Sequence, residues 1–285
     1  MRKMISIIIP AKNEEIGLKK TLQAFEMIGL DAEIIVVDDG STDNTASVAL
    51  ELGATVISHP YSKGNGAAIK SGARAANGDV FVFMDADGQH APEDIPKLLE
   101  MMSEGYDMVV GARDSGAQAN VMRYVANAIY NKLAGYMTGK RIDDLTSGLR
   151  VVNALKFREF ISLLPNGFSY PTTITMAFFR AGYSVGYYSA SVSKRHGKSH
   201  INPLKDGVRF LLIIFKISTL YSPLKIFFPM SFLIFVLGLI RYAYTYATVG
   251  SFTNMSATLF VASAQVFLIG LVAEQITTLM YKDDK

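Results

Sequence analysis

The 285-residue chain contains no cysteine. This absence excludes disulfide bonds, thiolate metal sites and cysteine nucleophiles, and it fits a reducing compartment. We also expect no secretory signal, because the apolar run that follows the basic N-terminus extends only from Met4 to Pro10. Residues 5–9 are therefore expected to form the first strand of a cytosolic domain.

Several familiar catalytic patterns are missing as well. The four histidines are scattered, and no His-x3-His pair with an intervening glutamate occurs, so a zinc site is not expected. No Gly-x-Ser-x-Gly elbow is present, which disfavours an esterase of the hydrolase type. The segment KGNGAAIKS at 63–71 is neither a phosphate loop nor a dinucleotide fingerprint, because Ile69 stands where both need glycine. Gly64 and Gly66 still permit a tight turn that opens a helix whose amides could face an anion.

Half of the residues are hydrophobic and the mean hydropathy is +0.24, so part of the chain is expected to face lipid. The apolar residues are unevenly distributed. Residues 1–202 alternate short apolar runs with amphipathic stretches, whereas residues 224–281 are almost continuously apolar. We expect a domain boundary near Asn202 and Pro203.

The N-terminal part is predicted to be an α/β domain with a mostly parallel sheet. Short runs rich in Ile, Val and Phe alternate with helical patterns, which is typical of a parallel sheet covered on both faces. The expected strands are 5–9, 33–37, 54–58, 79–84 and 107–111, and the expected helices are 15–27, 42–52, 66–76 and 92–103. Ligands bind beyond the carboxyl ends of such strands, where Pro10, Asp38, Asp39, Asp85 and Asp87 fall.

The C-terminal part contains two stretches, about 224–247 and 256–281, that are each long enough to cross a membrane as a helix. A buried helical hairpin in a soluble core is the alternative. Cations flank the two stretches, whereas the connection 248–255 carries no charge. The expected protein is thus a multi-pass protein of the cell membrane, with its catalytic domain and both termini cytoplasmic.

Residues 203–222 precede the first span and have apolar and cationic sides. They are expected to form an amphipathic helix at the membrane interface, and a connecting helix packed on the domain is the alternative. Glu274 and Gln275 lie within the second span, where polar side chains are costly. They either mark a helix contact or lie near the cytoplasmic interface.

The stretch FVFMDADGQH at 81–90 ends an apolar strand on two acids. Asp85, Asp87 and Gln89 alternate along an extended backbone, so their oxygens can converge. Such a set suits a divalent cation, Mg²⁺ or Mn²⁺, completed by water and phosphate oxygens. Two acids in a turn are otherwise simply solvated, but the buried strand in front directs these toward the crevice of the sheet.

Two further segments carry polar groups suited to a nucleotide. Asp38 and Asp39 follow the second strand and can accept hydrogen bonds from a base or ribose. The basic segment SKRHGKSH at 193–200 is either a solvated or lipid-contacting linker or a loop that closes over a diphosphate. In the second case Arg195 supplies a bidentate fork and Lys198 a point charge.

Taken together, these motifs resemble the family 2 glycosyltransferases. The segments are PAKNEE at 10–15, VVDDGSTDNT at 36–45, KGNGAAIKSG at 63–72, MDADGQH at 84–90, DLTSGLR at 144–150 and RHGKSH at 195–200. The chain looks most like the polyprenyl-phosphate group, which includes dolichol-phosphate mannose synthase and undecaprenyl-phosphate glucosyltransferase. Two C-terminal spans after an amphipathic helix resemble its tetrameric bacterial members, so a homo-oligomer, with a tetramer as one option, is expected.

The resemblance implies a GT-A fold, a nucleotide-sugar donor linked to UDP or GDP, and no nucleic-acid partner. By that resemblance the metal ligands are Asp85, Asp87 and Gln89, and the catalytic residues are these three with Arg123 and Asp144. The residues implied to bind the nucleotide sugar are Pro10, Ala11, Asn13, Glu14, Asp38, Asp39, Lys63, Asp85, Ala86, Asp87, Arg195 and Lys198. Those implied to bind the acceptor phosphate are Arg123, Asn127 and Arg195.

Three positions depart from the family pattern. Asn127 stands where relatives often have serine, Leu149 replaces phenylalanine, and His200 replaces a lysine. The first departure concerns an acceptor contact, and the DLTSGLR segment can equally be structural.

The expected reaction is an inverting transfer of one sugar from a nucleotide donor to a polyprenyl phosphate, undecaprenyl or dolichyl, at the cytoplasmic membrane face. Because that phosphate is already ionised near neutral pH, no general base is needed. Two alternatives remain. One is transfer to a hydroxyl of a glycan or lipid, which needs a carboxylate base such as Asp144, and the other is a membrane scaffold without catalysis.

Overall fold

The computed structural model of the chain describes residues 3–113, 121–167, 169–190, 215, 219 and 221–280, and the side chains of 121–127 are not described. Arg195, Lys198 and nearly all of the expected interfacial helix 203–222 lie outside the described residues. The chain divides into two compact units, Met1–Asn202 and Pro203–Lys285, which are treated separately below.

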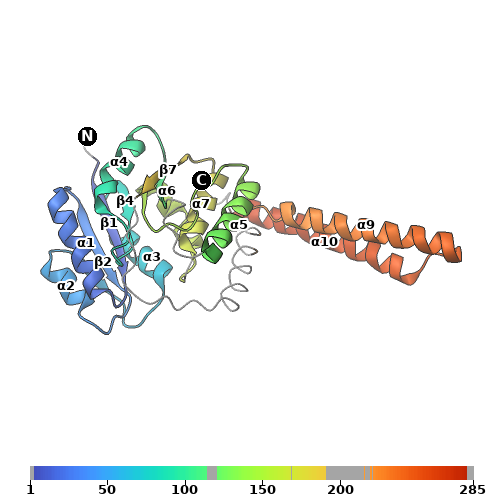
Figure 1. The fold of residues 1–285 in the computed structure, drawn as a ribbon, viewed down its shortest axis with the longest axis horizontal. Helices are drawn as coiled ribbons and strands as arrows, with labels where there is room; N and C mark the ends of the chain where they lie inside the picture. The colour runs from blue at the N-terminus through green and yellow to red at the C-terminus, as the bar shows by residue number, and fades with distance from the viewer. Residues whose placement is uncertain are drawn as a thin grey trace. The chain divides into compact units, whose positions relative to one another are not determined.

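The first unit contains a seven-stranded sheet with the order β3-β2-β1-β4-β6-β5-β7 (Figure 1). Every pairing is parallel except those of β6, which runs antiparallel to both β4 and β5. The sheet is therefore mostly parallel, as predicted. The strands are β1 (Ile5–Ala11), β2 (Glu33–Asp38), β3 (Thr55–Ser58), β4 (Val80–Phe83), β5 (Met108–Arg113), β6 (Arg150–Asn153) and β7 (Val185–Ala190).

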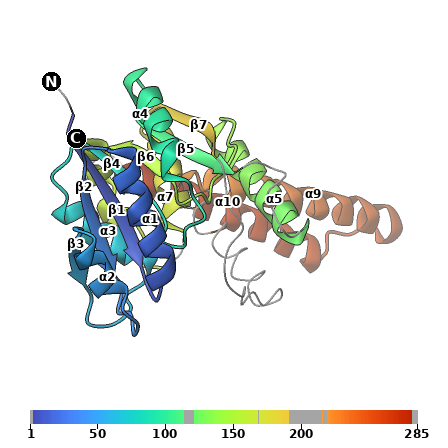
Figure 2. The same ribbon diagram turned by 60° about the vertical axis from the view of Figure 1, so that its left-hand side comes forward.

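Helices cover both faces of this sheet, as Figure 2 shows for α1 and α3 on opposite sides of β1 and β2. Because successive residues of a strand point to opposite faces, each buried strand needs apolar residues throughout. The helices of the first unit are α1 (Glu15–Ile28), α2 (Thr45–Glu51), α3 (Asn65–Ala75), α4 (Ile95–Ser103), α5 (Val121–Thr138), α6 (Ala154–Glu159) and α7 (Tyr170–Arg180), with 3-10 turns η1 (Pro92–Asp94) and η3 (Ile161–Leu163).

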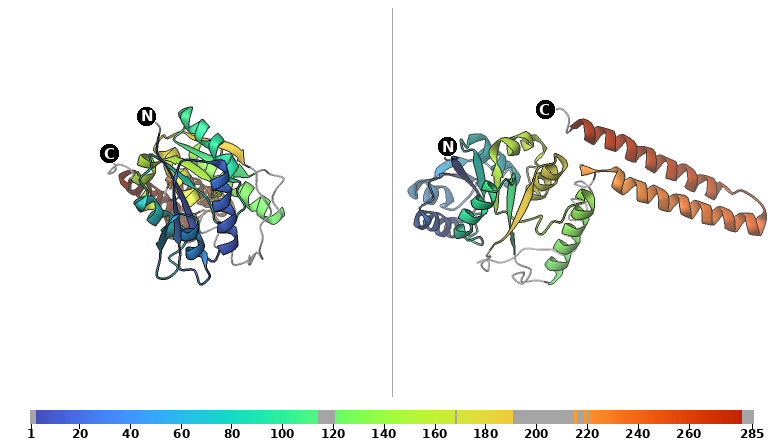
Figure 3. Two further views of the ribbon diagram at one scale, coloured as in Figure 1. Left: turned by 90° about the vertical axis from the view of Figure 1, so that its left-hand side faces the viewer. Right: turned by 90° about the horizontal axis from the view of Figure 1, so that it is seen from above.

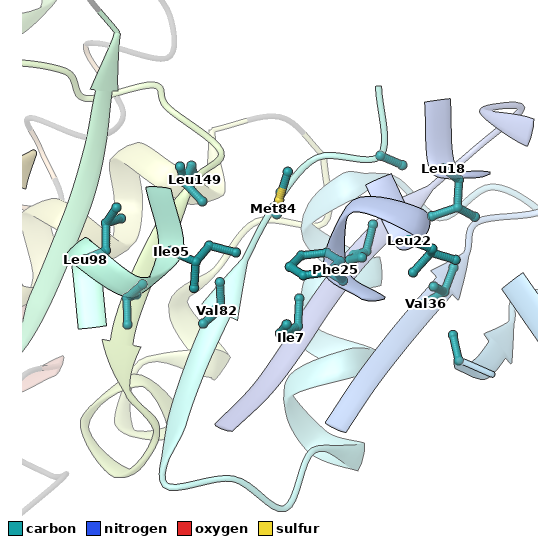
Figure 4. Close-up of a cluster of buried hydrophobic side chains, with 14 of the residues drawn as sticks. Ile7, Leu18, Leu22, Phe25, Val36, Val82, Met84, Ile95, Leu98 and Leu149 are labelled. Carbon is teal, nitrogen blue, oxygen red and sulfur yellow. The ribbon is translucent and has the colours of Figure 1, made fainter. Parts of the chain in front are cut away.

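The core on one face lies between the sheet and the helices α1 and α4 (Figure 4). Ile7 and Val36 contribute from the strands and Phe25 from α1, all nearly inaccessible to solvent. On the other face the rings of Phe81, Phe83 and Phe157 pack together, with centroids 4.7 to 6.1 Å apart. Both cores hold the strands rigid, so that the loops at their ends are positioned by the sheet.

The second unit is a hairpin of two long helices, α9 (Leu224–Val249) and α10 (Asn254–Met280), which run side by side (Figure 3). Each contains an 18-residue window with a mean hydropathy of 2.0, and both are long and apolar enough to cross a membrane. Only 11% and 17% of their most apolar windows are buried, so most of their apolar surface faces outward. This exposure argues against the alternative of a core hairpin in a soluble protein.

Small residues spaced seven apart form the contact between the two helices. The buried positions are Ser231, Gly238 and Thr245 in α9, and Ser256, Ser263, Gly270 and Thr277 in α10. A seven-residue repeat keeps one narrow stripe of each helix facing its partner, and small side chains let the backbones approach closely. The Ser263 hydroxyl donates to the Ser231 carbonyl across this contact, at 2.9 Å.

Glu274 makes a second kind of contact between these helices. One of its carboxylate oxygens accepts a hydrogen bond from the Leu224 backbone N–H, at 3.1 Å, and lies 3.4 Å from the Ser222 hydroxyl. The acid of α10 thus caps the N-terminus of α9, where backbone N–H groups lack partners within the helix. Of the two possibilities set out for this residue, the structure supports the helix contact.

Candidate functional site

The candidate site lies at the carboxyl edge of the sheet. The parallel strands β1, β2 and β4 all end there, and antiparallel β6 begins there, since Arg150 pairs with Phe83 at the end of β4. The reversed direction of β6 therefore brings the preceding segment, residues 144–149, to the same edge. Four segments that are distant in sequence meet at this edge.

The turn from Asp85 to Gln89 follows β4 directly. A carboxylate oxygen of Asp87 accepts a hydrogen bond from the Gln89 backbone N–H, at 3.1 Å, and Gly88 adopts a positive φ of 69° that favours glycine. This local turn brings the backbone back on itself within three residues. It sets the positions from which the two acids and the amide project.

Two glycines from different parts of the chain pack closely against this turn. A side chain at Gly17, in the first turn of α1, would lie 2.5 Å from the carbonyl oxygen of Ala86. A side chain at Gly148 would collide with the Asp85 carboxylate itself. The acid is thus pressed against the backbone of the 144–150 segment, and both neighbours must lack a Cβ.

The electrostatic environment of Asp85 is unusual for a surface turn. Burial raises the pKa of Asp85, and the nearby Asp87 acts in the same direction, while His90, Arg113 and Arg150 act against them without outweighing them. His90 is buried, its Nδ1 has no hydrogen-bond partner, and burial lowers its pKa despite the neighbouring acids. Two crowded carboxylates beside a neutral imidazole form a site that would gain from a bound cation.

Asp144 and Arg113 form a bidentate ion pair beside the turn. Arg113 donates through Nε at 2.7 Å and through a terminal nitrogen at 3.0 Å, and the backbone N–H groups of Thr146 and Ser147 donate to the same acid. Burial alone would raise the pKa of Asp144, but these hydrogen bonds and the charge of Arg113 lower it. In the described contacts Asp144 holds Arg113 and its own loop, and its catalytic role stays a prediction.

Arg150 is a buried cation behind the same segment, with 1% of its surface exposed. Its guanidinium donates to the carbonyl oxygens of Ser147, Leu145 and Pro171 and to the hydroxyl of Thr175. These bonds link the 144–150 loop to α7. The structural interpretation of the DLTSGLR segment is thus supported for Arg150.

Asp39 lies at the end of β2 and its carboxylate is fully hydrogen-bonded. One oxygen accepts from His59 and the Lys63 N–H, and the other from the Ser62 hydroxyl and the Gly64 N–H, all at 2.7 to 2.8 Å. Burial alone would raise its pKa, yet these donors lower it to about 2. Asp39 therefore organises the loop 59–64. A nucleobase N–H that donated to this carboxylate would have to share an oxygen with one of these donors or displace it.

The second nitrogen of His59 lies 2.9 Å from the Ser71 hydroxyl, so a hydrogen-bond chain runs from Asp39 into α3. Two amides at the N-terminus of α3, where the glycines suggested an anion site, have backbone partners within the chain. The Gly66 and Ala67 N–H groups donate to the carbonyl oxygens of Gly167 and Asn166, at 3.2 and 2.9 Å. The helix end is covered by the 165–167 segment, which satisfies these amides.

The loop after β1 is joined to the loop after β2. Asn13, with a positive φ of 54°, accepts from the Thr42 N–H at 2.8 Å, and its own N–H donates to Ser41. The Glu14 N–H donates to Thr45 at 3.0 Å, and the Ala11 carbonyl accepts from the Asp39 N–H at 2.9 Å. Pro10 is tolerated in β1 because β4 pairs with β1 only as far as Ile8.

The residues present suit a hard divalent cation. Among the described residues, no three His, Cys, Asp or Glu side chains gather closely enough to hold a metal. The predicted ligands supply two carboxylates and an amide oxygen. Water and ligand phosphates would have to fill the remaining coordination positions of the cation, as is usual for Mg²⁺. The donor types of Asp85, Asp87 and Gln89 fit such an ion, and the nearby buried Nδ1 of His90 has no hydrogen-bond partner within the protein.

The structure thus brings together most of the predicted residues. Those placed at the edge are Pro10, Ala11, Asn13, Glu14, Asp38, Asp39, Lys63, Asp85, Ala86, Asp87, Gln89 and Asp144. Arg123 and Asn127 lie on α5, but their side chains lie outside the described ones, as do Arg195 and Lys198 altogether. Sequence reasoning missed Arg113, His90 and the two enclosing glycines. Arg113 lies two residues beyond the predicted strand 107–111 and ends the observed strand β5, and this position after an apolar run is the signal that could have found it.

Comparison with known families supports two parts of the chain. A model described as glycosyl transferase family 2 matches residues 6–161, and one described as the GtrB C-terminal hairpin matches residues 222–279. The first model covers all the described segments around the candidate site up to β6. The second covers the helices α9 and α10.

Two individual enzymes also match part of the chain. The chain is 33% identical over 191 residues to the undecaprenyl-phosphate 4-deoxy-4-formamido-L-arabinose transferase of Photorhabdus laumondii subsp. laumondii. This match covers 60% of this chain and 58% of the relative. The same enzyme of Pectobacterium atrosepticum is 37% identical with the same coverage. The chain therefore spans less than two thirds of the length of these relatives.

The fold is shared with glucosyl-3-phosphoglycerate synthase from Mycobacterium tuberculosis. Its complex with Mn²⁺, UDP and glucosyl-3-phosphoglycerate matches at 23% identity with a TM-score of 0.61, over 75% of this chain and 78% of that one. The predicted fold, a GT-A domain followed by two apolar helices, is confirmed. Because a single family model covers more than half of its length, the chain belongs to glycosyl transferase family 2.

Proposed function

We propose that this chain transfers a sugar from a nucleotide-diphosphate sugar to the phosphate of a membrane polyprenol, with inversion at the anomeric carbon. Family membership supports the sugar transfer, and the named relatives act on undecaprenyl phosphate. The apolar hairpin supports a lipid acceptor. UDP and GDP are both candidates for the nucleotide of the donor sugar, and the solved complexes of glucosyl-3-phosphoglycerate synthase contain UDP or UDP-glucose.

The observation that carries the choice of acceptor is the ion pair between Arg113 and Asp144. A hydroxyl acceptor requires a carboxylate base, and Asp144 was the candidate for it. Its oxygens are occupied by Arg113 and by backbone N–H groups, and its pKa is lowered, so it is a poor base. A phosphate acceptor is already ionised and needs no such group.

The donor would lie along the carboxyl edge. Its nucleoside would contact the loops after β1 and β2, where Asp38 is buried and accepts the Ser41 N–H at 3.0 Å. Its diphosphate would lie at the Asp85–Gln89 turn, and a divalent cation held by Asp85, Asp87 and Gln89 would neutralise the departing diphosphate. Lys63, which is exposed beside Asp39, adds a positive charge at this edge.

The transfer itself then consists of positioning and charge control. An oxygen of the acceptor phosphate forms the new bond to the anomeric carbon, the bond from that carbon to the diphosphate breaks, and its electron pair leaves with the nucleoside diphosphate. Arg113 is held by Asp144 close to Asp85, where it can balance the phosphate charges. Arg123, Asn127, Arg195 and Lys198 are proposed to complete the phosphate contacts.

The same proposal includes the placement of the chain. Residues 1–202 form the catalytic domain on the cytoplasmic side, 203–222 an interfacial helix and 223–285 a membrane hairpin, within a homo-oligomer. What supports this placement is the division of the chain at Asn202 and Pro203 and the length of α9 and α10.

The test uses the full chain in membranes that contain undecaprenyl or dolichyl phosphate. Labelled UDP- and GDP-sugars are added, the lipids are extracted, and label is sought in a lipid that releases its sugar in mild acid. Asp87→Asn should reduce transfer by about 100-fold or more, because it removes a negative charge that would hold the cation, and the cation would stabilise the leaving diphosphate. Glu104→Gln, at an exposed residue that ends α4 at the opposite edge, is the matched control.

Label in a soluble glycan instead of a lipid would favour the hydroxyl-acceptor alternative. Absence of transfer and hydrolysis with every donor would favour the scaffold. Near-normal transfer by Asp87→Asn would contradict the assigned role of the turn.

A further inference from the structure

The ring of His90 is buried at the candidate site with one nitrogen left without a partner. Only 6% of the residue is exposed, and among the described residues nothing is hydrogen-bonded to its Nδ1. A buried polar atom of this kind is costly, because it has lost its hydrogen bond to water without gaining another. His90 follows Gln89 directly, so this nitrogen belongs to the same turn as the proposed metal ligands. A group bound at the turn could supply the missing partner.

The ring lies among the charged groups of the candidate site. Burial lowers the pKa of His90, and the charge of Arg113 lowers it further. The carboxylates of Asp85, Asp87 and Asp144 raise this pKa but do not outweigh burial. The imidazole is therefore neutral near pH 7, and its Nδ1 accepts a hydrogen bond when the proton is on Nε2.

A divalent cation at this turn would bring hydrogen-bond donors that need such an acceptor. Asp85, Asp87 and Gln89 would supply three of the about six ligands that Mg²⁺ takes, so water and phosphate oxygens would fill the other positions. A water molecule bound to a divalent cation is a strong hydrogen-bond donor. Within the described ranges, His90 and the two acids do not gather closely enough to hold a metal by themselves, so direct ligation by the ring is not favoured. Contact through a bound water is the remaining arrangement.

We propose that His90 is a positioning residue of the cation site, and that its Nδ1 accepts a hydrogen bond from a water molecule bound to the divalent cation. The inference rests on the proposed function, because that function includes the cation at the turn. The hydrogen bond holds the water, and thereby the coordination shell around the diphosphate, in one orientation. Loss of such a partner typically weakens metal binding by about 10- to 100-fold.

Two amide substitutions separate the roles of the two ring nitrogens. In His90→Asn the side-chain oxygen can take the place of Nδ1, whereas in His90→Gln the amide reaches the place of Nε2. The full chain in detergent is titrated with Mn²⁺, alone and with UDP or GDP, and the unbound Mn²⁺ is measured by electron paramagnetic resonance. His90→Gln should bind Mn²⁺ at least about 10-fold more weakly than the wild type, and His90→Asn should stay close to it.

Two further variants complete the series. His90→Phe keeps a ring in the buried position but has no nitrogen, so it should lose as much Mn²⁺ affinity as His90→Gln. Glu93→Gln removes an exposed acid three residues further along the chain and should bind Mn²⁺ as the wild type does. Circular dichroism shows that each variant is folded before its affinity is compared.

Wild-type affinity in folded His90→Gln or His90→Phe would overturn the proposal. Equal weakening in both amide variants would overturn it too, because the affinity would then depend on the packing of the ring and not on an acceptor at Nδ1. Weaker binding of the nucleotide with unchanged affinity for Mn²⁺ alone would show that His90 contacts the phosphates instead. If the wild type bound no Mn²⁺ with or without nucleotide, the cation site would fail together with this inference, and the labelled-lipid assay would show separately whether transfer occurs.

Discussion

Glycine is required at two close approaches in the candidate site. Gly17 admits the carbonyl of Ala86, and Gly148 admits the carboxylate of Asp85. These contacts fix the turn after β4 from both sides, and neither glycine needs a positive φ to do so. Their value lies in the missing side chain, which is why a glycine without turn geometry can still be essential.

Gly148→Ala tests this interpretation at the level of one methyl group. The added Cβ would occupy the space of the Asp85 carboxylate and displace it from the proposed cation site. We expect transfer to fall about 10- to 100-fold, since small displacements of charged groups weaken transition-state stabilisation strongly. Steady-state transfer and the thermal unfolding midpoint are measured together.

Gly167→Ala is the control, because a Cβ at Gly167 meets no atom within 4 Å. It should leave transfer almost unchanged. If Gly148→Ala also retained full transfer activity with an unchanged unfolding midpoint, the tight packing of Asp85 against the 144–150 segment would not be needed for transfer.

At the scale of the element, β6 explains how the site is assembled. Arg150 and Asp144 flank a loop that reaches the carboxyl edge only because β6 is antiparallel to its neighbours. The sequence did not predict β6, because this four-residue strand begins with a buried arginine and lacks the apolar run by which a strand is recognised. The five predicted strands, by contrast, are apolar runs with clear turn signals, and each was found within about two residues at either end.

Candidate site residues were predictable where they follow such strands. Asp38, Asp39, Asp85 and Asp87 end apolar runs, and a parallel sheet brings those ends to one edge. His59 was not predictable, because its role depends on hydrogen bonds to Asp39 and Ser71, residues that are 20 and 12 positions away. Such tertiary hydrogen bonds leave no periodic trace in the sequence.

The hairpin of α9 and α10 is held together by a regular sequence pattern. Its seven-residue repeat of small residues keeps the helices close, and a Cβ at Gly270 would lie 2.6 Å from the Cβ of Phe227. Gly270→Leu should therefore separate the helices and destabilise the hairpin by about 1 to 3 kcal/mol, as expected for overpacking. The loss of helical circular dichroism with temperature in detergent measures this effect.

Ala264→Leu provides the comparison, because Ala264 is exposed on the outer side of α10. It adds a similar volume without entering the contact between the helices. Equal stability of both variants would contradict the idea that the small-residue stripe sets the helix separation.

For the whole molecule, hydrogen-bonded carboxylates make stability depend on pH. The carboxylates with lowered pKa values are Glu33, Asp39, Asp43, Asp107 and Asp144. A lowered pKa means that the unfolded chain takes up the proton first, so stability is present above the ordinary pKa and is lost as the pH falls. Asp85, whose pKa is raised, acts in the opposite direction and is outnumbered among the described carboxylates with shifted pKa values.

The first unit should accordingly lose stability between about pH 4 and pH 2, the window between the ordinary and the lowered pKa of Asp39. Asp39 alone contributes up to about 2 kcal/mol of this loss. Asp39→Asn should be less stable than the wild type at pH 7, because its amide cannot accept from the Gly64 N–H and the Ser62 hydroxyl as the carboxylate does. Toward pH 2 the protonated wild type loses the same interactions, so the two urea midpoints, followed by circular dichroism of the full chain in detergent, should converge. Parallel curves over the whole range would show that the hydrogen bonds of Asp39 do not depend on its charge.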